Sequence, residues 1–72
     1  MTYQNYISID PNIRFGKPCI KGTRISVFDV LGWMGSGMTK EEVIKDYPEI
    51  TEDALHACLV YAATKERQLE VA

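Results

Sequence analysis

The chain changes character across residues 16–27, which read Gly16-Lys17-Pro18-Cys19-Ile20-Lys21-Gly22-Thr23-Arg24-Ile25-Ser26-Val27. Gly16 and Gly22 allow the positive φ that tight turns use, and Pro18 favours an extended residue before it. Residues 23–27 are rich in β-forming types, and every long apolar pattern that follows is helical. Three basic side chains lie in the same stretch. Residues 16–27 are therefore expected to form either a contact surface or a hinge that sets the oligomeric state.

Size and composition predict one small domain over residues 1–72. A chain of 72 residues buries only about 60% of the surface that its unfolded form exposes, so its core is thin. With 46% apolar residues it can fold, but Cys19 and Cys58 lack Cys-x-x-Cys spacing and indicate neither a disulfide framework nor a metal site. We expect both cysteines to be small core residues and the protein to be a homodimer.

The beginning of the chain shows no targeting signal. Residues 1–6 lack a charged start followed by an apolar run, and no apolar stretch approaches the ~20 residues that cross a bilayer. The sequence therefore predicts a soluble, cytoplasmic protein without membrane contact.

Charge is distributed unevenly along the chain. The formal net charge is −2, which argues against indiscriminate nucleic-acid binding. Residues 1–27 carry Arg14, Lys17, Lys21 and Arg24 against Asp10, a net charge of +3, and the remainder carries −5. We expect an anionic partner to meet the basic N-terminal part first.

Residues 1–25 are expected to form a basic β extension. Apolar Ile7 and Ile9 alternate with polar neighbours, which predicts a strand over residues 6–10 with both isoleucines on the buried face. Asp10-Pro11-Asn12 is a turn signal. Residues 13–15 can resume an extended run, and residues 20–25 are the candidate for a second strand beside the first.

Residues 26–69 are expected to form a three-helix bundle, with helices near residues 27–35, 40–47 and 52–69. Ser26 with Asp29 and Thr39 with Glu42 have the spacing of capping boxes, and Thr51 is the third cap. Gly35-Ser36-Gly37 and Pro48 end the first two helices. The inward residues are Val27, Val30, Leu31, Met34, Val43, Ile44, Tyr47, Leu55, Cys58, Leu59 and Ala62.

Catalysis is not indicated. One histidine, isolated serines and no paired carboxylates leave no set of nucleophile, base and orienting group, so we expect no enzyme, no catalytic residues and no small-molecule substrate. The glycines lack the order of a phosphate-binding loop, so no nucleotide or other cofactor is expected. His56 is interpreted as a surface or boundary residue.

The helix order is that of a tri-helical helix-turn-helix domain, in which the third helix would read the major groove of DNA. Its first turn, however, offers Glu52, Asp53 and His56, and phosphates would repel the two carboxylates. A three-helix bundle without DNA contact is the other interpretation. If DNA is bound, the basic extension is the better candidate.

Four segments carry a family resemblance: Ile9-Asp10-Pro11, Gly16-Lys17-Pro18-x-Ile20-x-Gly22-Thr23-Arg24-Ile25-x-Val27, Gly37-Met38-Thr39-x-Glu41-Glu42-Val43-Ile44 and Asp46-Tyr47-Pro48-x-Ile50-Thr51. Together they resemble the small bacterial family known as domain of unknown function 433. The resemblance implies a mainly α fold, a homeodomain-like or winged-helix-like helix-turn-helix bundle with an N-terminal two-stranded β extension. It also implies a VapB-type antitoxin of a type II toxin-antitoxin pair, encoded beside a PIN-like nuclease toxin.

The residues of the basic extension fall into two groups with different expected roles. Gly16, Pro18, Gly22 and Thr23 are interpreted as backbone formers. Lys17, Lys21 and Arg24, with Arg14, are the candidate contacts to the toxin or to operator DNA. A competing interpretation pairs Arg24 with Asp10 or with a helix carboxylate inside the fold. The alternative function is a homodimeric protein-protein interaction module that binds no DNA.

Overall fold

The structure, a computed structural model, describes residues 2–69. Three helices dominate it: α1 (Val27–Gly35), α2 (Lys40–Asp46) and α3 (Glu52–Leu69). They are preceded by a 3₁₀ turn, a two-stranded antiparallel sheet and a second short turn between its strands: η1 (Tyr3–Asn5), β1 (Ile7–Ser8), η2 (Arg14–Gly16) and β2 (Cys19–Ile20). The mainly helical fold with an N-terminal β extension is therefore confirmed.

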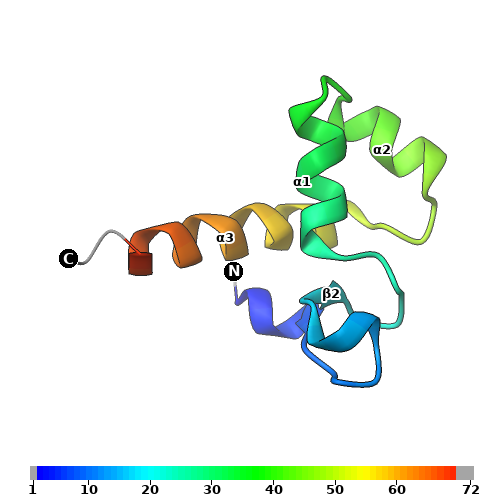
Figure 1. The fold of residues 1–72 in the computed structure, drawn as a ribbon. Coiled ribbons are helices and arrows are strands. Elements are labelled where there is room, and N and C mark those ends of the chain that lie inside the picture. The colour runs from blue at the N-terminus through cyan, green and yellow to red at the C-terminus, as the bar shows by residue number, and fades with distance from the viewer. Residues whose placement is uncertain (1, 70–72) are drawn as a thin grey trace.

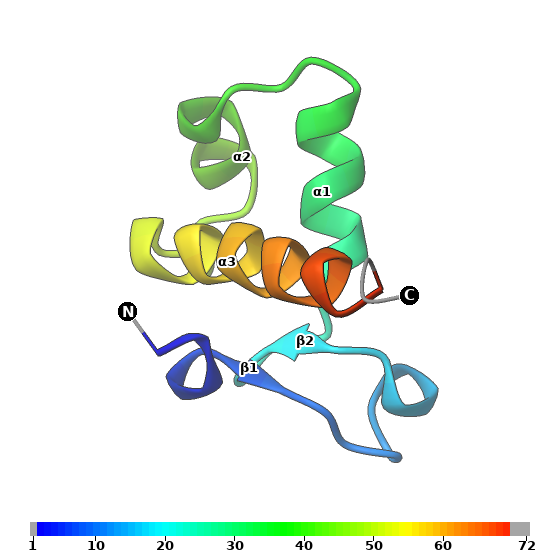
Figure 2. The ribbon, with the colours of Figure 1, turned by 90° about the vertical axis from the view of Figure 1, so that its left-hand side faces the viewer.

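α1 and α2 lie on one side of α3, and the β extension lies on the other side. In Figure 1, α3 runs across the molecule, and α1 and α2 stand on one side of it. Figure 2 shows the two strands on the other side of α3. We call residues 2–25 the ribbon and residues 26–69 the helical body.

Local capping explains where the helices begin. Ser26 Oγ accepts from the Asp29 N–H, and the Asp29 carboxylate accepts from the Ser26 N–H, each at 3.0 Å. Thr39 and Glu42 make the same reciprocal pair. Thr51 Oγ1 accepts from the Ala54 N–H at 3.1 Å. These contacts satisfy amides that have no partner inside the helix, as the sequence predicts.

The helix ends follow from backbone geometry. Gly37 has φ of +111° just beyond α1, a conformation that other residues resist. The expected helix 40–47 was one residue too long, because Tyr47 has φ −128° and ψ 78° ahead of Pro48. Proline discourages helical geometry in the residue before it.

One apolar core joins the three helices to the ribbon. Its buried members are Ile7, Ile20, Val27, Val30, Val43, Ile50, Ala54, Leu55, Ala57, Cys58 and Tyr61. Ile7 and Ile20 face each other across the sheet and attach the ribbon to the helices. The Tyr3 ring meets the Tyr61 ring edge-on, with centroids 5.3 Å apart. No helix of the described chain has the length and apolarity that a bilayer crossing requires.

Both cysteines are buried and unbonded, as expected of small core residues. Burial raises the pKa of the Cys58 thiol to about 11. The thiolate is therefore scarce near neutral pH, and this side chain acts as a small apolar group.

The prediction for Leu59 was wrong, since 40% of this residue is exposed. The buried stripe of α3 runs through Ala54, Ala57, Cys58 and Tyr61. At about 100° per residue, Leu59 falls at the edge of that stripe.

The predicted strands of the ribbon were too long. β1 covers residues 7–8 instead of 6–10, and Ile9 is 62% exposed instead of buried. The strand ends because the Asp10 carboxylate accepts from the Asn12 N–H at 2.9 Å and starts a turn.

Of the second strand predicted over residues 20–25, only Ile20 belongs to β2, and residues 21–25 form a loop. The Thr23 N–H donates to the Ile20 carbonyl at 3.1 Å, and Gly22 between them has φ of +78°. The Ile20 N–H donates to the Ile25 carbonyl at 2.9 Å, which closes the loop. A positive φ at the third position is typical of a type II turn, so Lys21 occupies its corner.

Residues 13–15 also depart from the expected extended run. Arg14 and Phe15 have left-handed backbones, with φ of 52° and 58°, and Gly16 continues at 83°. The Gly16 N–H donates to the Ile13 carbonyl, and the Lys17 N–H donates to the Arg14 carbonyl. The chain thus makes a tight turn where an extended segment was predicted.

Candidate functional site

The candidate site is the loop that carries the four basic residues of the ribbon. We call residues 13–25 the basic loop. The four residues interpreted as backbone formers, Gly16, Pro18, Gly22 and Thr23, lie within it. Gly16 and Gly22 take positive φ, and a Cβ on Gly16 would lie 4.0 Å from the Pro11 Cα. The Pro18 carbonyl accepts from the Val27 N–H at 2.9 Å. Thr23 Oγ1 donates to the Ile20 carbonyl and accepts from the Ile25 N–H.

Arg14 anchors the basic loop to α1. Its Nη1 lies 3.0 Å from Asp29 Oδ2 and donates to the Arg24 carbonyl at 2.7 Å. The side chains of Arg14 and Asp29 are 31% and 34% exposed, so the pair is partly shielded from water. One guanidinium nitrogen therefore ties together two parts of the loop and the first turn of α1.

Asp29 serves the helix cap and the loop anchor at the same time. Its Oδ2 accepts from the Ser26 N–H and from Arg14. Burial alone would raise the pKa of this carboxyl. The hydrogen bonds from Ser26 and Arg14 outweigh that effect and hold the pKa below its ordinary value of 3.8. Asp29 is therefore ionised at neutral pH and holds the loop in place.

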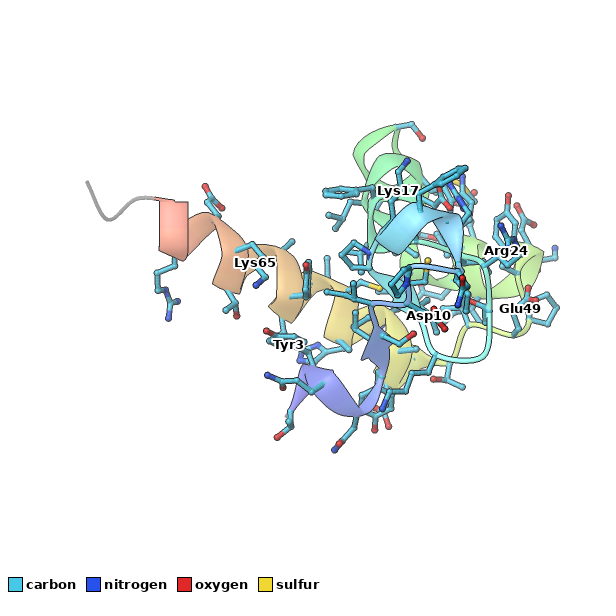
Figure 3. The ribbon with its side chains drawn as sticks, turned by 60° about the horizontal axis from the view of Figure 1, so that its bottom comes forward. Tyr3, Asp10, Lys17, Arg24, Glu49 and Lys65 are labelled. Atoms are coloured by element: carbon cyan, nitrogen blue, oxygen red, sulfur yellow. The ribbon has the colours of Figure 1, made fainter. Side chains whose placement is uncertain are left out.

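Lys17, Lys21 and Arg24 are exposed. Within residues 2–69, no carboxylate forms an ion pair with any of them. Figure 3 shows Lys17 and Arg24 on the ribbon side of the molecule. The interpretation that Arg24 makes an internal ion pair is wrong, because Arg14 takes the helix carboxylate. The sequence predicted the kind of bond but assigned it to the wrong arginine.

A groove of about 830 Å³ runs between the basic loop and the helices. The Arg14–Asp29 pair borders it, and Arg24 and Glu49 line it as exposed charges of opposite sign. Both are labelled on the same side of the molecule in Figure 3. The Trp33 and Tyr47 rings also line the groove and stack with centroids 4.0 Å apart and planes 7° apart.

No sequence signal assigned Trp33 and Tyr47 to this site. Both residues fit the apolar patterns of the helices expected over residues 27–35 and 40–47, which predicts core packing. Only the approach of α1 and the end of α2 brings the rings together. The groove lining therefore combines a stacked aromatic pair with one exposed positive and one exposed negative side chain.

The surface formed by α2, the turn after it and the first turn of α3 is negatively charged, in contrast to the basic loop. Exposed carboxylates gather there from Glu41, Glu42, Asp46, Glu49, Glu52 and Asp53. Lys40 Nζ lies 2.8 Å from Glu52 Oε1, and this hydrogen bond holds the pKa of Glu52 below its usual range. The first turn of α3 is thus anionic and repels a phosphate backbone.

The part of the chain that the structure describes contains no cluster of potential metal ligands. No three His, Cys, Asp or Glu side chains within residues 2–69 come together as a metal site. His56 lies exposed on α3.

Comparison with known proteins gives one family. The family model described as "Protein of unknown function (DUF433)" matches residues 7–62. The uncharacterized protein y4eO of Sinorhizobium fredii (strain NBRC 101917 / NGR234) is 27% identical over 56 residues, which are 78% of this chain and 25% of that protein.

A crystal structure of a DUF433 member protein from Anabaena variabilis ATCC 29413 has the same fold. Its TM-score is 0.83 at 30% identity, over 93% of this chain and 66% of that one. The chain thus spans a quarter of the length of one relative and about two thirds of the other. Because the family model matches more than half of its residues, this chain belongs to the DUF433 family.

Proposed function

We propose that this protein is the antitoxin of a type II toxin-antitoxin pair and that its basic loop neutralises a PIN-like nuclease. One observation carries the proposal: an acidic protein holds three exposed cations, Lys17, Lys21 and Arg24, without internal partners among residues 2–69. Cations left unpaired on a fixed loop are suited to an anionic partner.

The chemistry of the proposed partner complements the loop. PIN-like nucleases resemble metal-dependent RNases that hold a cluster of carboxylates. Lys21 at the corner of its turn and Arg24 three residues later can each donate charge-assisted hydrogen bonds to such a cluster or to an acidic surface beside it. The Arg14–Asp29 pair fixes the loop beforehand, so less conformational freedom is lost on binding.

The test is co-purification with the product of the adjacent gene. The wild-type protein should co-purify with the nuclease and inhibit its RNA cleavage. The double variant Lys21→Glu/Arg24→Glu should neither bind the nuclease nor inhibit it. The matched control is Lys45→Glu/Arg67→Glu, which changes the charge equally at exposed positions on α2 and α3. Equal binding by the loop variant and the wild type would contradict the proposal.

Operator DNA is the second proposed ligand, and the anionic first turn of α3 favours the basic loop over α3 as its contact. A gel shift on the protein's own promoter region at two salt concentrations tests this. Three phosphate contacts should give a slope of about −2.7 in log affinity against log salt. Lys17→Gln should reduce that slope by about one, whereas Glu52→Gln should leave binding equal or tighter. A low-salt gel without a shift would remove DNA from the proposal.

A homodimeric interaction module is the alternative, and a second groove favours it. This groove, of about 310 Å³, lies between α1 and α3 and is lined mostly by apolar side chains, among them Leu31 and Tyr61. Phe28 at its edge is 61% exposed. Phe28→Gln should convert a dimer to a monomer in sedimentation equilibrium. A wild-type protein that is monomeric at high concentration would exclude this alternative.

A further inference from the structure

Phe15 is completely exposed, with 100% of its surface in water. No other large apolar side chain that the structure describes reaches this value: Ile9 and Phe28, the next two, are 62% and 61% exposed. A phenylalanine ring has one of the largest gains from burial that any side chain offers. Because the Phe15 side chain is fully exposed, its burial contributes nothing to the stability of this chain.

The backbone at Phe15 is also of a kind that this residue resists. Its φ is 58° and its ψ is 33°, in the left-handed region, and the preceding Arg14 is left-handed too. For a residue with a Cβ this conformation is strained, and glycine or asparagine would adopt it more easily. Phenylalanine is therefore a poor choice for the local backbone as well as for solvent exposure.

The strained turn is held from several sides. The Ile13 N–H donates to the Asp10 carbonyl at 2.9 Å, and the Gly16 N–H donates to the Ile13 carbonyl at 3.1 Å. The Arg14 guanidinium is fixed to Asp29 and to the Arg24 carbonyl. These bonds prevent the turn from relaxing, so the ring is presented outward on a fixed support.

We infer that Phe15 is the apolar anchor of the partner interface, inserting into a pocket on the partner protein whose rim carries carboxylates. The inference rests on the proposed function and names the residue that gives the interface most of its affinity. Lys17, labelled in Figure 3 at the end of this turn, is the exposed cation nearest in sequence and faces the acidic rim in this proposal. Protein interfaces are enriched in aromatic side chains and have a polar rim that remains accessible to solvent.

A protein pocket fits this surface better than DNA. Phenylalanine can also wedge between base steps, but proteins that do so surround the wedge with cations that contact phosphates. Lys17, Lys21 and Arg24 can contact phosphates as well as carboxylates, but the helical body is strongly acidic and repels a DNA duplex. Insertion into DNA is therefore an outcome that the experiment must distinguish.

The experiment compares Phe15→Asn with the wild type. Asparagine keeps the left-handed turn and removes the ring. The melting temperature should stay equal or rise, while the affinity for the purified PIN-like nuclease from the adjacent gene, measured by calorimetry, should fall roughly 30-fold or more. Leu59→Gln, which removes an exposed apolar side chain from α3, is the matched control and should leave the affinity within roughly twofold.

Each other outcome overturns the inference. If Phe15→Asn binds like the wild type while Lys21→Glu/Arg24→Glu does not, Phe15 is not the anchor and the proposed function stands. If the wild type itself does not bind the nuclease, both fail. A lower melting temperature for Phe15→Asn would show a structural role for the ring. Loss of the promoter gel shift with full nuclease affinity would assign the ring to DNA.

Discussion

The helical body and the ribbon are stabilised in different ways. The body buries apolar side chains from three capped helices and from the turn before α3, including Val27, Val30 and Ile50, which have no exposed surface. The ribbon has strands of only two residues each and attaches to the core through Ile7 and Ile20. Most of its shape comes from turns, from glycines with positive φ and from the Arg14–Asp29 pair.

This difference separates the side chains that stabilise the fold from the charged side chains that stay exposed. An isolated two-stranded ribbon is marginal in water, so the ribbon depends on the helical body for support. In return, the ribbon uses few of its charged side chains for its own structure. Lys17, Lys21 and Arg24 remain exposed on the ribbon, which the body holds in place.

The largest expected effect belongs to the core of the body. Leu55→Ala should lower the free energy of unfolding by about 3 kcal/mol, because the side chain is buried and its loss leaves a cavity. That is a large share of the roughly 4–11 kcal/mol expected for a domain of this size. Urea denaturation followed by circular dichroism measures it. Leu59→Ala, on the same helix but 40% exposed, should lower it by less than about 1 kcal/mol.

The bond between the two regions should have an intermediate effect. Asp29→Asn should lower the free energy of unfolding by about 1.5 kcal/mol at pH 7, because the α1 cap and the Arg14 anchor lose their shared anion. The ribbon should loosen more than the body, seen as faster amide exchange at Lys17 and Thr23.

The pH dependence of this effect follows from the lowered pKa of Asp29. A carboxyl with a lower pKa in the folded state stabilises the protein fully above its ordinary value of 3.8, and this contribution disappears as the pH falls through the folded-state pKa. The difference between wild type and Asp29→Asn should therefore be constant from pH 7 to about 5 and shrink below about pH 4. A difference that grows on acidification would contradict this assignment.

The smallest expected effects come from two glycines with opposite signs. Gly22→Ala should lower the free energy of unfolding by about 1 kcal/mol, because φ at this position is +78° although the added Cβ meets no neighbour. Gly32→Ala, exposed within α1, should raise it by about 0.5–1 kcal/mol through higher helix propensity. If Gly22→Ala also raised stability, the ribbon would not depend on its special backbone positions. Thermal unfolding of both variants measures the pair.

Sequence patterns predicted the helical body well because its signals are local. A capping box joins residues three positions apart, so Ser26 with Asp29 and Thr39 with Glu42 identify their helix starts without knowledge of the fold. The positive φ of Gly16 and Gly22 is likewise a property of single residues. The mainly helical fold and the basic character of the ribbon were therefore determined by the sequence alone.

Only the tertiary structure decided which side chains of the basic loop are bound within the fold and which are exposed. Arg14 and Asp29 are 15 residues apart, and Trp33 and Tyr47 are 14 apart, so each pair meets only after α1, α2 and the ribbon are packed. The left-handed backbone at Phe15 also depends on these bonds, since a phenylalanine alone would avoid it. Long-range pairing made Arg14 an anchor, left Arg24 exposed and turned Phe15 toward the solvent.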